Sequence, residues 1–263
     1  MTDHALEAAS DALWQHWQQG TRIDSLPTSI RPFTRAAGYA VQARLEARST
    51  APLFGWKIAA TSKPGQVHIA VSGPLAGRLL AERVRPNGAE IPFGANHMRV
   101  AEAEFAFRMA ADLPTRKMGF AVDDVMDAVD TLHPAIEVPD SRYNDFTRVG
   151  EAQLIADNAC AHYFVLGEAT PDTWRSLDLG AHVVKARIEG KADCQGRGAN
   201  VLGDPRTALT WLVNELSELG ITLKAGQVVT TGTCVVPLPI EPGDRVIADF
   251  GVLGKVEARL GAS

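Results

Sequence analysis

The stretch VAEAEFAFR at residues 100–108 places two glutamates one residue apart inside an apolar run. If residues 99–109 form a strand, alternate side chains lie on opposite faces, so Glu102 and Glu104 project from the same side. On a helix the two side chains would point about 200° apart and could not share a ligand. The other face of the strand is uniformly apolar and holds Ala101, Ala103, Phe105, Phe107 and Met109.

A second acid interrupts an apolar run in HPAIEVPDSRY, residues 133–143, where Glu137 would share a strand face with His133 and Ala135. If the three glutamates converge, they offer three hard oxygen ligands, a set that suits Mg²⁺ or Mn²⁺. Zinc would favour histidine or cysteine at some of these positions. The alternative is that the E-x-E pair lies on the solvated outer face of an edge strand, although glutamate is a poor strand former. The sequence leaves both interpretations open.

The composition argues against a nucleic-acid-binding protein and against a membrane-spanning one. The chain has 263 residues, of which 46% are hydrophobic and 22% charged, enough for one large core or a core with a smaller appendage. A net charge of −5 with scattered basic residues argues against nucleic-acid binding. No apolar run approaches the ~20 residues that span a bilayer, and the polar N-terminus is unlike a secretory signal. The three cysteines are far apart and form no C-x-x-C pair, so we expect a reduced, cytoplasmic setting.

The pattern of apolar residues predicts an α+β fold with a mixed or antiparallel sheet. Residues 1–50 are expected to form an N-terminal helical part, with one helix ending at Gly20 and a second running from a Thr34 cap to about Arg48. Residues 51–263 are expected to form a β-rich catalytic domain with two inserted helices. One begins at Asp123 and Asp124 and keeps an apolar side as far as residue 132. The other begins after an Asp204 cap and ends at Gly220.

Five ordered motifs resemble one known family. They are GWKIAATS (55–62), VAEAEFAF (100–107), PAIEVPDSR (134–142), IADNACAHYFVLG (155–167) and TGTCVVPLPIEPGDRVIADFGVLGKVEARL (231–260). Together they resemble the 2-keto-4-pentenoate hydratases and 2-oxo-3-hexenedioate decarboxylases of the fumarylacetoacetate-hydrolase superfamily. The resemblance implies a β-roll-like catalytic domain and a divalent metal, Mg²⁺ or Mn²⁺, held by Glu102, Glu104 and Glu137. It also places Lys57 near the substrate, as the group that transfers a proton or stabilises the enolate oxygen, and we expect a neighbouring dication to lower the pKa of Lys57.

The resemblance also implies a set of substrate-binding residues. These are Thr61, Ser62, Gln66, Asp140, Cys160, Gly232 and Thr233. Asp140 and Arg142 could form an ion pair that orients Glu137, or a purely structural salt bridge. The chain departs from the family in two places: Val71 and Ser72 stand where members usually carry an acidic residue, and the D-N-A-S-S motif reads DNACA.

The implied function is a hydratase that adds water to a 2-hydroxy-2,4-dienoate and gives a 4-hydroxy-2-oxo acid in aromatic-compound catabolism. A 2-oxo-3-enedioate decarboxylase is the first alternative, with Arg142, Arg78 or His162 as the contact for the second carboxylate. Hydrolysis of an acylpyruvate ranks third. A catalytically degenerate paralogue that binds 2-oxo acids is the non-enzymatic alternative. The family resemblance further implies a homo-oligomer, with a paired decarboxylase or aldolase as a candidate partner.

Overall fold

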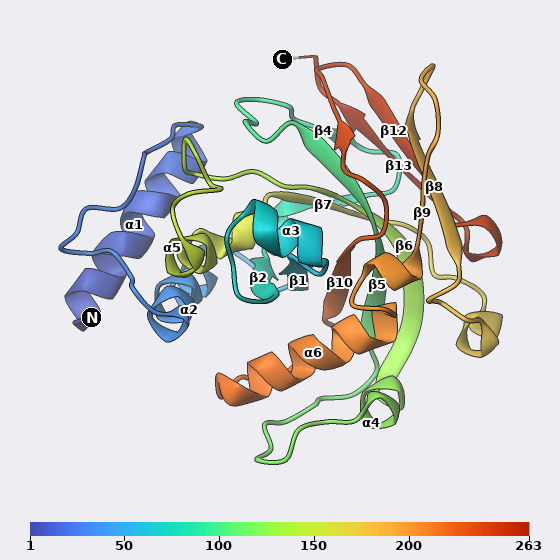
Figure 1. The fold of residues 1–263 in the computed structure, drawn as a ribbon, viewed down its shortest axis with the longest axis horizontal. Helices are drawn as coiled ribbons and strands as arrows, with labels where there is room; N and C mark the ends of the chain where they lie inside the picture. Colours follow the sequence, from blue (N-terminus) through green and yellow to red (C-terminus); the bar gives the residue numbers. More distant parts are fainter. Residues whose placement is uncertain (263) are drawn as a thin grey trace.

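The computed structural model describes residues 1–262 and combines two β-sheets with helices that flank the larger one (Figure 1). The helices are α1 Asp3–Gln19, α2 Arg35–Ala43, α3 Lys63–His68, α4 Val122–Met126, α5 Glu151–Ala156 and α6 Pro205–Glu218. Across these residues, no helix has both the length and the apolar character needed to cross a membrane. The predicted α+β class and the curled, mixed sheet are confirmed.

The larger sheet has the strand order β2-β1-β10-β5-β6-β7-β3, and β11 pairs with β5 beside β10. Its strands are β1 Gly55–Ala59, β2 Leu75–Leu79, β3 Val84–Pro86, β5 Val100–Met109, β6 Val129–Val138, β7 Tyr163–Leu166, β10 Val228–Thr233 and β11 Leu238–Pro239. The pairs β1–β10 and β3–β7 are parallel, and the other pairs in this sheet are antiparallel. The E-x-E strand β5 therefore lies in the interior of the sheet.

The second sheet has the order β4-β13-β12-β8-β9. Its strands are β4 Glu90–Ile91, β8 Val183–Ile188, β9 Cys194–Arg197, β12 Arg245–Asp249 and β13 Lys255–Leu260. It rises beside one end of the larger sheet (Figure 1). Phe105 of β5 packs edge-on against Phe250, which follows β12, with ring centroids 5.1 Å apart. This contact ties the two sheets together.

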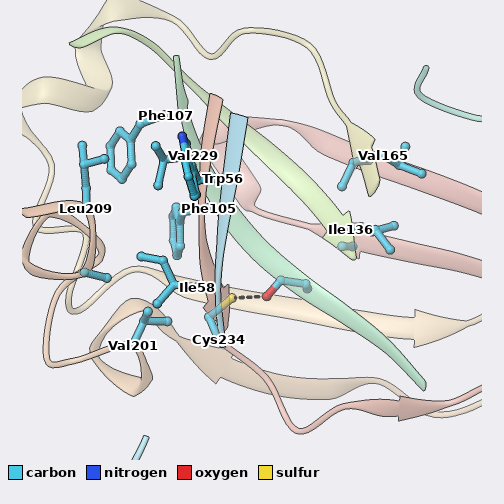
Figure 2. Packing of buried hydrophobic residues seen from close by; sticks show 14 of the residues in the cluster. Trp56, Ile58, Phe105, Phe107, Ile136, Val165, Val201, Leu209, Val229 and Cys234 are labelled. Atoms are coloured by element: carbon cyan, nitrogen blue, oxygen red, sulfur yellow. Dashed lines mark hydrogen bonds between the residues drawn. The ribbon is translucent and has the colours of Figure 1, made fainter. Parts of the chain in front are cut away.

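The main core lies on the apolar face of β5. Phe105 and Phe107 are fully buried and pack with Trp56 and Ile58 of β1, while Leu209 brings α6 onto this face (Figure 2). Burying one such side chain contributes roughly 1.5–3 kcal/mol to folding. The alternation predicted for β5 is therefore present, with the glutamates on the opposite face.

The N-terminal helices begin and end largely where the sequence predicts. Thr34 caps α2, its hydroxyl accepting a hydrogen bond from the Ala37 amide, and Gly20 ends α1 with a φ of +65°. The second helix is shorter than predicted: α2 ends at Ala43, and only one 3₁₀ turn, Glu46–Arg48, follows. Because α2 packs against α5 from the middle of the chain, the division at residue 50 stays a prediction.

The helix predicted from Asp123 to residue 132 is wrong in its second half. Helix α4 ends at Met126, and Val129 begins β6. Val129 and Leu132 fit a helical spacing, but this segment pairs with β5, where Leu132 lies opposite Phe107. Strand pairing with a buried neighbour outweighs local helical periodicity. Helix α6 follows the prediction, because the Asp204 carboxylate accepts from the Arg206 amide and Gly220 has a φ of +75°.

We predict that Gly55→Ala destabilises the protein strongly. A Cβ at residue 55 would lie 1.8 Å from the Val228 carbonyl oxygen, so β1 could not keep its pairing with β10. A loss of about 2 kcal/mol or more in the free energy of unfolding is expected from urea denaturation. Gly73→Ala is the matched control, since its Cβ would meet nothing within 4 Å. Equal urea midpoints for the two variants would contradict this account.

Candidate metal centre and substrate cavity

Strand pairing brings the three glutamates together. Glu102 of β5 lies directly opposite Glu137 of β6, and Glu104 follows on the same face of β5. Side chains at opposed positions on one face have their Cβ atoms about 4.5–5.5 Å apart. One carboxylate oxygen from each glutamate lies within 4.8 Å of the other two. The alternative of a solvated edge strand is wrong, because β10 and β6 flank β5.

The carboxylates are buried and only partly satisfied. Glu104 and Glu137 are both 0% exposed, whereas Glu102 is partly exposed. One Glu104 oxygen accepts hydrogen bonds from the Thr230 hydroxyl and, at 2.8 Å, from the Gly232 amide. Among the described residues, the other Glu104 oxygen and both oxygens of Glu137 accept no hydrogen bond, and one Glu137 oxygen makes only an ion pair with Lys57. Buried carboxylate oxygens without donors fit the ligand set of a hard divalent cation.

Burial raises the pKa values of this cluster, and repulsion between the carboxylates raises two of them further. Two carboxylate charges 4.8 Å apart repel by about 3–4 kcal/mol at an effective dielectric constant near 20. Burial, reinforced by repulsion from Glu137, raises the pKa of Glu102 to about 7. Burial also raises the pKa of Glu137, and burial with repulsion from both neighbours raises that of Glu104 well above its usual value. Protons and metal ions therefore compete for the same oxygens.

Lys57 supplies the positive charge beside the cluster. Its Nζ lies 3.1 Å from a Glu137 oxygen and donates a hydrogen bond of 3.0 Å to the Ala159 carbonyl. Burial alone would lower the pKa of Lys57, but attraction to the three glutamates outweighs it and raises the pKa to about 12. The lowered pKa expected from the sequence would require a cation that offsets the carboxylate charge. Without one, Lys57 stays protonated.

A left-handed turn presents the Ala159 carbonyl to Lys57. Asn158, Ala159 and Cys160 all have positive φ angles, of 56°, 50° and 61°. The Asn158 side chain holds the turn to β2, because it accepts from the amide of Arg78 and donates to the carbonyl of the same residue. Non-glycine residues in this conformation are held there by their surroundings, often at functional sites. The DNACA motif marked this segment, but sequence reasoning missed the role of Asn158.

A bulge in β10 turns a backbone amide toward Glu104. The register between β10 and β5 shifts between Thr230 and Thr233, and Gly232 lies in the bulge with a φ of +94°. A Cβ at this position would also lie 2.4 Å from the Thr61 hydroxyl oxygen. Both constraints favour glycine. Sequence reasoning selected Gly232 but missed Thr230, the second donor to Glu104.

A cavity of about 750 Å³ is lined at one end by Glu102 and Lys57. Five of the predicted substrate-binding residues line it. These are Thr61, Ser62, Cys160, Gly232 and Thr233. Gln66 lies behind the wall, where its side-chain amide donates to the Ala60 carbonyl and its oxygen accepts from Lys63. Burial raises the pKa of the Cys160 thiol to about 12, so this side chain is a neutral part of the wall and not a nucleophile.

Asp140 lies outside this cavity. It borders a separate cavity of about 290 Å³, where its carboxylate pairs with Arg22 and accepts from the backbone amides of His97 and Met98. The ion pair expected between Asp140 and Arg142 does not form, because the Arg142 guanidinium binds the carboxylate of Asp157 and touches only the Asp140 carbonyl. These contacts connect Asp140, which follows β6, to Arg22 in the N-terminal part of the chain.

We predict that Mg²⁺ stabilises the protein more at pH 8 than at pH 5.5. In the metal-free protein the raised pKa of Glu102, about 7 against an ordinary 4.5, gives stability that is complete below pH 4.5 and lost as the pH rises through 7. Mg²⁺ should restore it once the carboxylates are ionised. Thermal unfolding in Mg²⁺ and in EDTA measures the difference at each pH. Glu102→Gln should reduce both the shift and its pH dependence; equal shifts for the unsubstituted protein at both pH values would contradict the argument.

Comparison with known proteins agrees with this geometry. Residues 63–261 match the model of the fumarylacetoacetate (FAA) hydrolase C-terminal family. A 2-keto-4-pentenoate hydratase from Paraburkholderia xenovorans (strain LB400) is 31% identical, over 97% of this chain and 95% of that protein. A 2-hydroxyhexa-2,4-dienoate hydratase from Comamonas testosteroni is 35% identical, over 77% of this chain and 76% of that protein.

A solved structure has nearly the same fold. The 4-oxalocrotonate decarboxylase from Pseudomonas putida G7, complexed with magnesium and adipate, superposes with a TM-score of 0.89 at 28% identity. The match covers 99% of this chain and 98% of that one. Together with the family match over most of the sequence, this shows that the chain belongs to the fumarylacetoacetate hydrolase family.

Proposed function

We propose that this chain is a metal-dependent hydro-lyase that adds water to a 2-hydroxy-2,4-dienoate and releases a 4-hydroxy-2-oxo acid. The observation that carries the proposal is the arrangement of Glu102, Glu104, Glu137 and Lys57, which β5, β6 and β1 of the larger sheet bring together at one end of a cavity that can hold a small organic acid. Relatives that are at least 30% identical and bear hydratase names support this reaction.

We propose that the three glutamates hold Mg²⁺ or Mn²⁺, since the donor set consists only of carboxylate oxygens. When bound, such an ion supplies Lewis acidity that favours negative charge on the keto oxygen of a 2-oxo acid. The relative complexed with magnesium supports this assignment. We also retain a homo-oligomer, a paired decarboxylase or aldolase partner and a cytoplasmic location as proposals.

Lys57 holds its protons where a substrate oxygen can use them. An ammonium group has three N–H donors. One is directed at the Ala159 carbonyl and another lies beside Glu137, which leaves a third for a ligand in the cavity. In its ammonium form, Lys57 can hydrogen-bond to an oxygen that becomes anionic as the dienol is converted to the ketone. The ion pair with Glu137 fixes Nζ before substrate arrives.

A decarboxylase acting on a 2-oxo-enedioate is the second candidate, favoured by the fold shared with the solved decarboxylase. The cations expected to bind its second carboxylate are engaged elsewhere. Arg78 pairs with Glu46, Arg142 pairs with Asp157, and His162 accepts a hydrogen bond from the Trp17 indole. None of these three side chains lines the large cavity.

The direct test uses freshly generated 2-hydroxypenta-2,4-dienoate with the Mg²⁺-loaded protein. We expect the dienol absorbance to fall and a 4-hydroxy-2-oxo acid to accumulate, with no release of CO₂ from the corresponding enedioate. Loss of absorbance only at the non-enzymatic rate, despite binding of Mg²⁺ and oxalate, would instead identify a degenerate paralogue. Release of CO₂ would identify the decarboxylase.

We predict that Lys57→Met lowers kcat by about 100-fold or more while Mg²⁺ still binds, because the substitution keeps the buried volume but removes the donor beside the carboxylates. Steady-state kinetics and Mg²⁺ titration measure the two effects separately. Lys191→Met is the control, since Lys191 is an exposed residue between β8 and β9 whose ammonium group pairs with Asp244 on the surface. Similar kcat values for the two variants would exclude a catalytic role for Lys57.

A further inference from the structure

The charge in the large cavity is confined to one end. Of the described residues that line it, only Lys57 and Glu102 carry a lysine, arginine or carboxylate charge, and both belong to the metal end. Among the described residues that line the cavity, one is a histidine, His68. It is exposed, and its ring packs near Phe146. A substrate held by its 2-oxo-carboxylate end would therefore extend away from all the charges that hold it.

The rest of the wall is largely apolar and comes from segments far apart in the sequence. These side chains are Ile69, Leu75, Met98, Phe146, Leu154 and Val235. Three of them, Ile69, Met98 and Phe146, are only partly buried although they pack against the main core. Val236 at the same wall is 71% exposed. Apolar surface left open inside a cavity is the usual environment for an apolar ligand group.

On the described part of this wall, no lysine or arginine other than Lys57 is present to pair with a second substrate carboxylate. Arg78 and Arg142, two candidates for this contact, are each 2% exposed and already paired with carboxylates. Transfer of a carboxylate from water to an apolar site without a partner is strongly unfavourable. The remaining cation, Lys57, is paired with Glu137 at the metal end of the cavity.

The volume of the cavity indicates that the substrate carries a substituent at the end away from the 2-oxo acid group. About 750 Å³ falls within the range of roughly 300–1,000 Å³ found for sites that hold drug-sized ligands. The five-carbon parent dienoate would leave much of this space empty. An alkyl or aryl substituent at the distal end would cover the open apolar side chains.

We propose that the cavity selects 2-oxo acids and 2-hydroxydienoates whose tail is uncharged and apolar, and that it discriminates against dicarboxylates of the same length. This inference rests on the proposed function, because it takes the glutamates and Lys57 as the end that binds the 2-oxo acid. It separates this chain from a relative whose structure contains the dicarboxylate adipate. The selecting feature is the apolar wall formed by Ile69, Met98 and Phe146 with Val236 at its edge.

Binding of two non-reacting acids tests the proposal without turnover. 2-Oxohexanoate and 2-oxoadipate have the same chain length and differ in a terminal methyl or carboxylate group. With the Mg²⁺-loaded protein, calorimetry should give a Kd at least tenfold lower for 2-oxohexanoate. Each methylene added from 2-oxobutyrate onward should lower the Kd by about threefold to fourfold while the wall is being covered. Equal Kd values, or tighter binding of 2-oxoadipate, would overturn the proposed selectivity while leaving the 2-oxo-acid site intact. If neither acid binds, the site itself and the proposed function fail.

Two variants that each add a positive charge test whether the wall at Val236 contacts the substrate tail. Val236→Arg places a cation at the cavity wall, whereas Val252→Arg places one on the loop between β12 and β13. The two valines are 71% and 74% exposed, so both variants should fold. We expect Val236→Arg to tighten 2-oxoadipate binding by about fivefold or more with little change for 2-oxohexanoate, and Val252→Arg to change neither. An equal change for both acids in Val236→Arg, or no change, would contradict the assignment of the tail to this wall.

Discussion

Repulsion among three buried carboxylates is the constraint on which the site depends. Glu102, Glu104 and Glu137 meet on one sheet face, where burial and proximity both oppose ionisation. Lys57 is the one buried cation that lies against them in the described part of the chain. A cluster of this kind is stable in its ionised form only when further positive charge is present, which links metal binding, protonation and folding stability in one set of atoms.

Irregular backbone supports this cluster at two points. The bulge at Gly232 directs an amide to Glu104, and the left-handed turn from Asn158 to Cys160 directs a carbonyl to Lys57. The amide stabilises the negative charge of Glu104, and the carbonyl stabilises the positive charge of Lys57. The regular strands place the glutamates and Lys57 on the same face of the sheet. The irregular segments leave a backbone amide and a carbonyl free to bond these side chains, whereas in a regular strand such groups would bond to the neighbouring strand.

The cavity separates the two tasks of substrate recognition. Charged groups at the metal end suit the 2-oxo-carboxylate group that the proposed substrates have in common. The apolar wall around Phe146 contacts the tail, which differs from one substrate to another. The arginines buried nearby, Arg78 and Arg142, act in the scaffold. Binding energy for the tail therefore comes from apolar burial, and discrimination comes from the cost of placing an unpaired charge there.

The sequence by itself determined the strand character of residues 100–109, the apolar and acidic faces of that strand, and the caps of α6 at Asp204 and Gly220, because these follow from local periodicity and turn chemistry. The family motifs pointed to Lys57 and the three glutamates. Only the tertiary structure decided that Glu102 faces Glu137, that the segment from Val129 pairs as a strand, and that Asp140 binds Arg22 away from the cavity. Strand register and the choice of ion-pair partner arise between segments distant in the chain, so no local pattern encodes them.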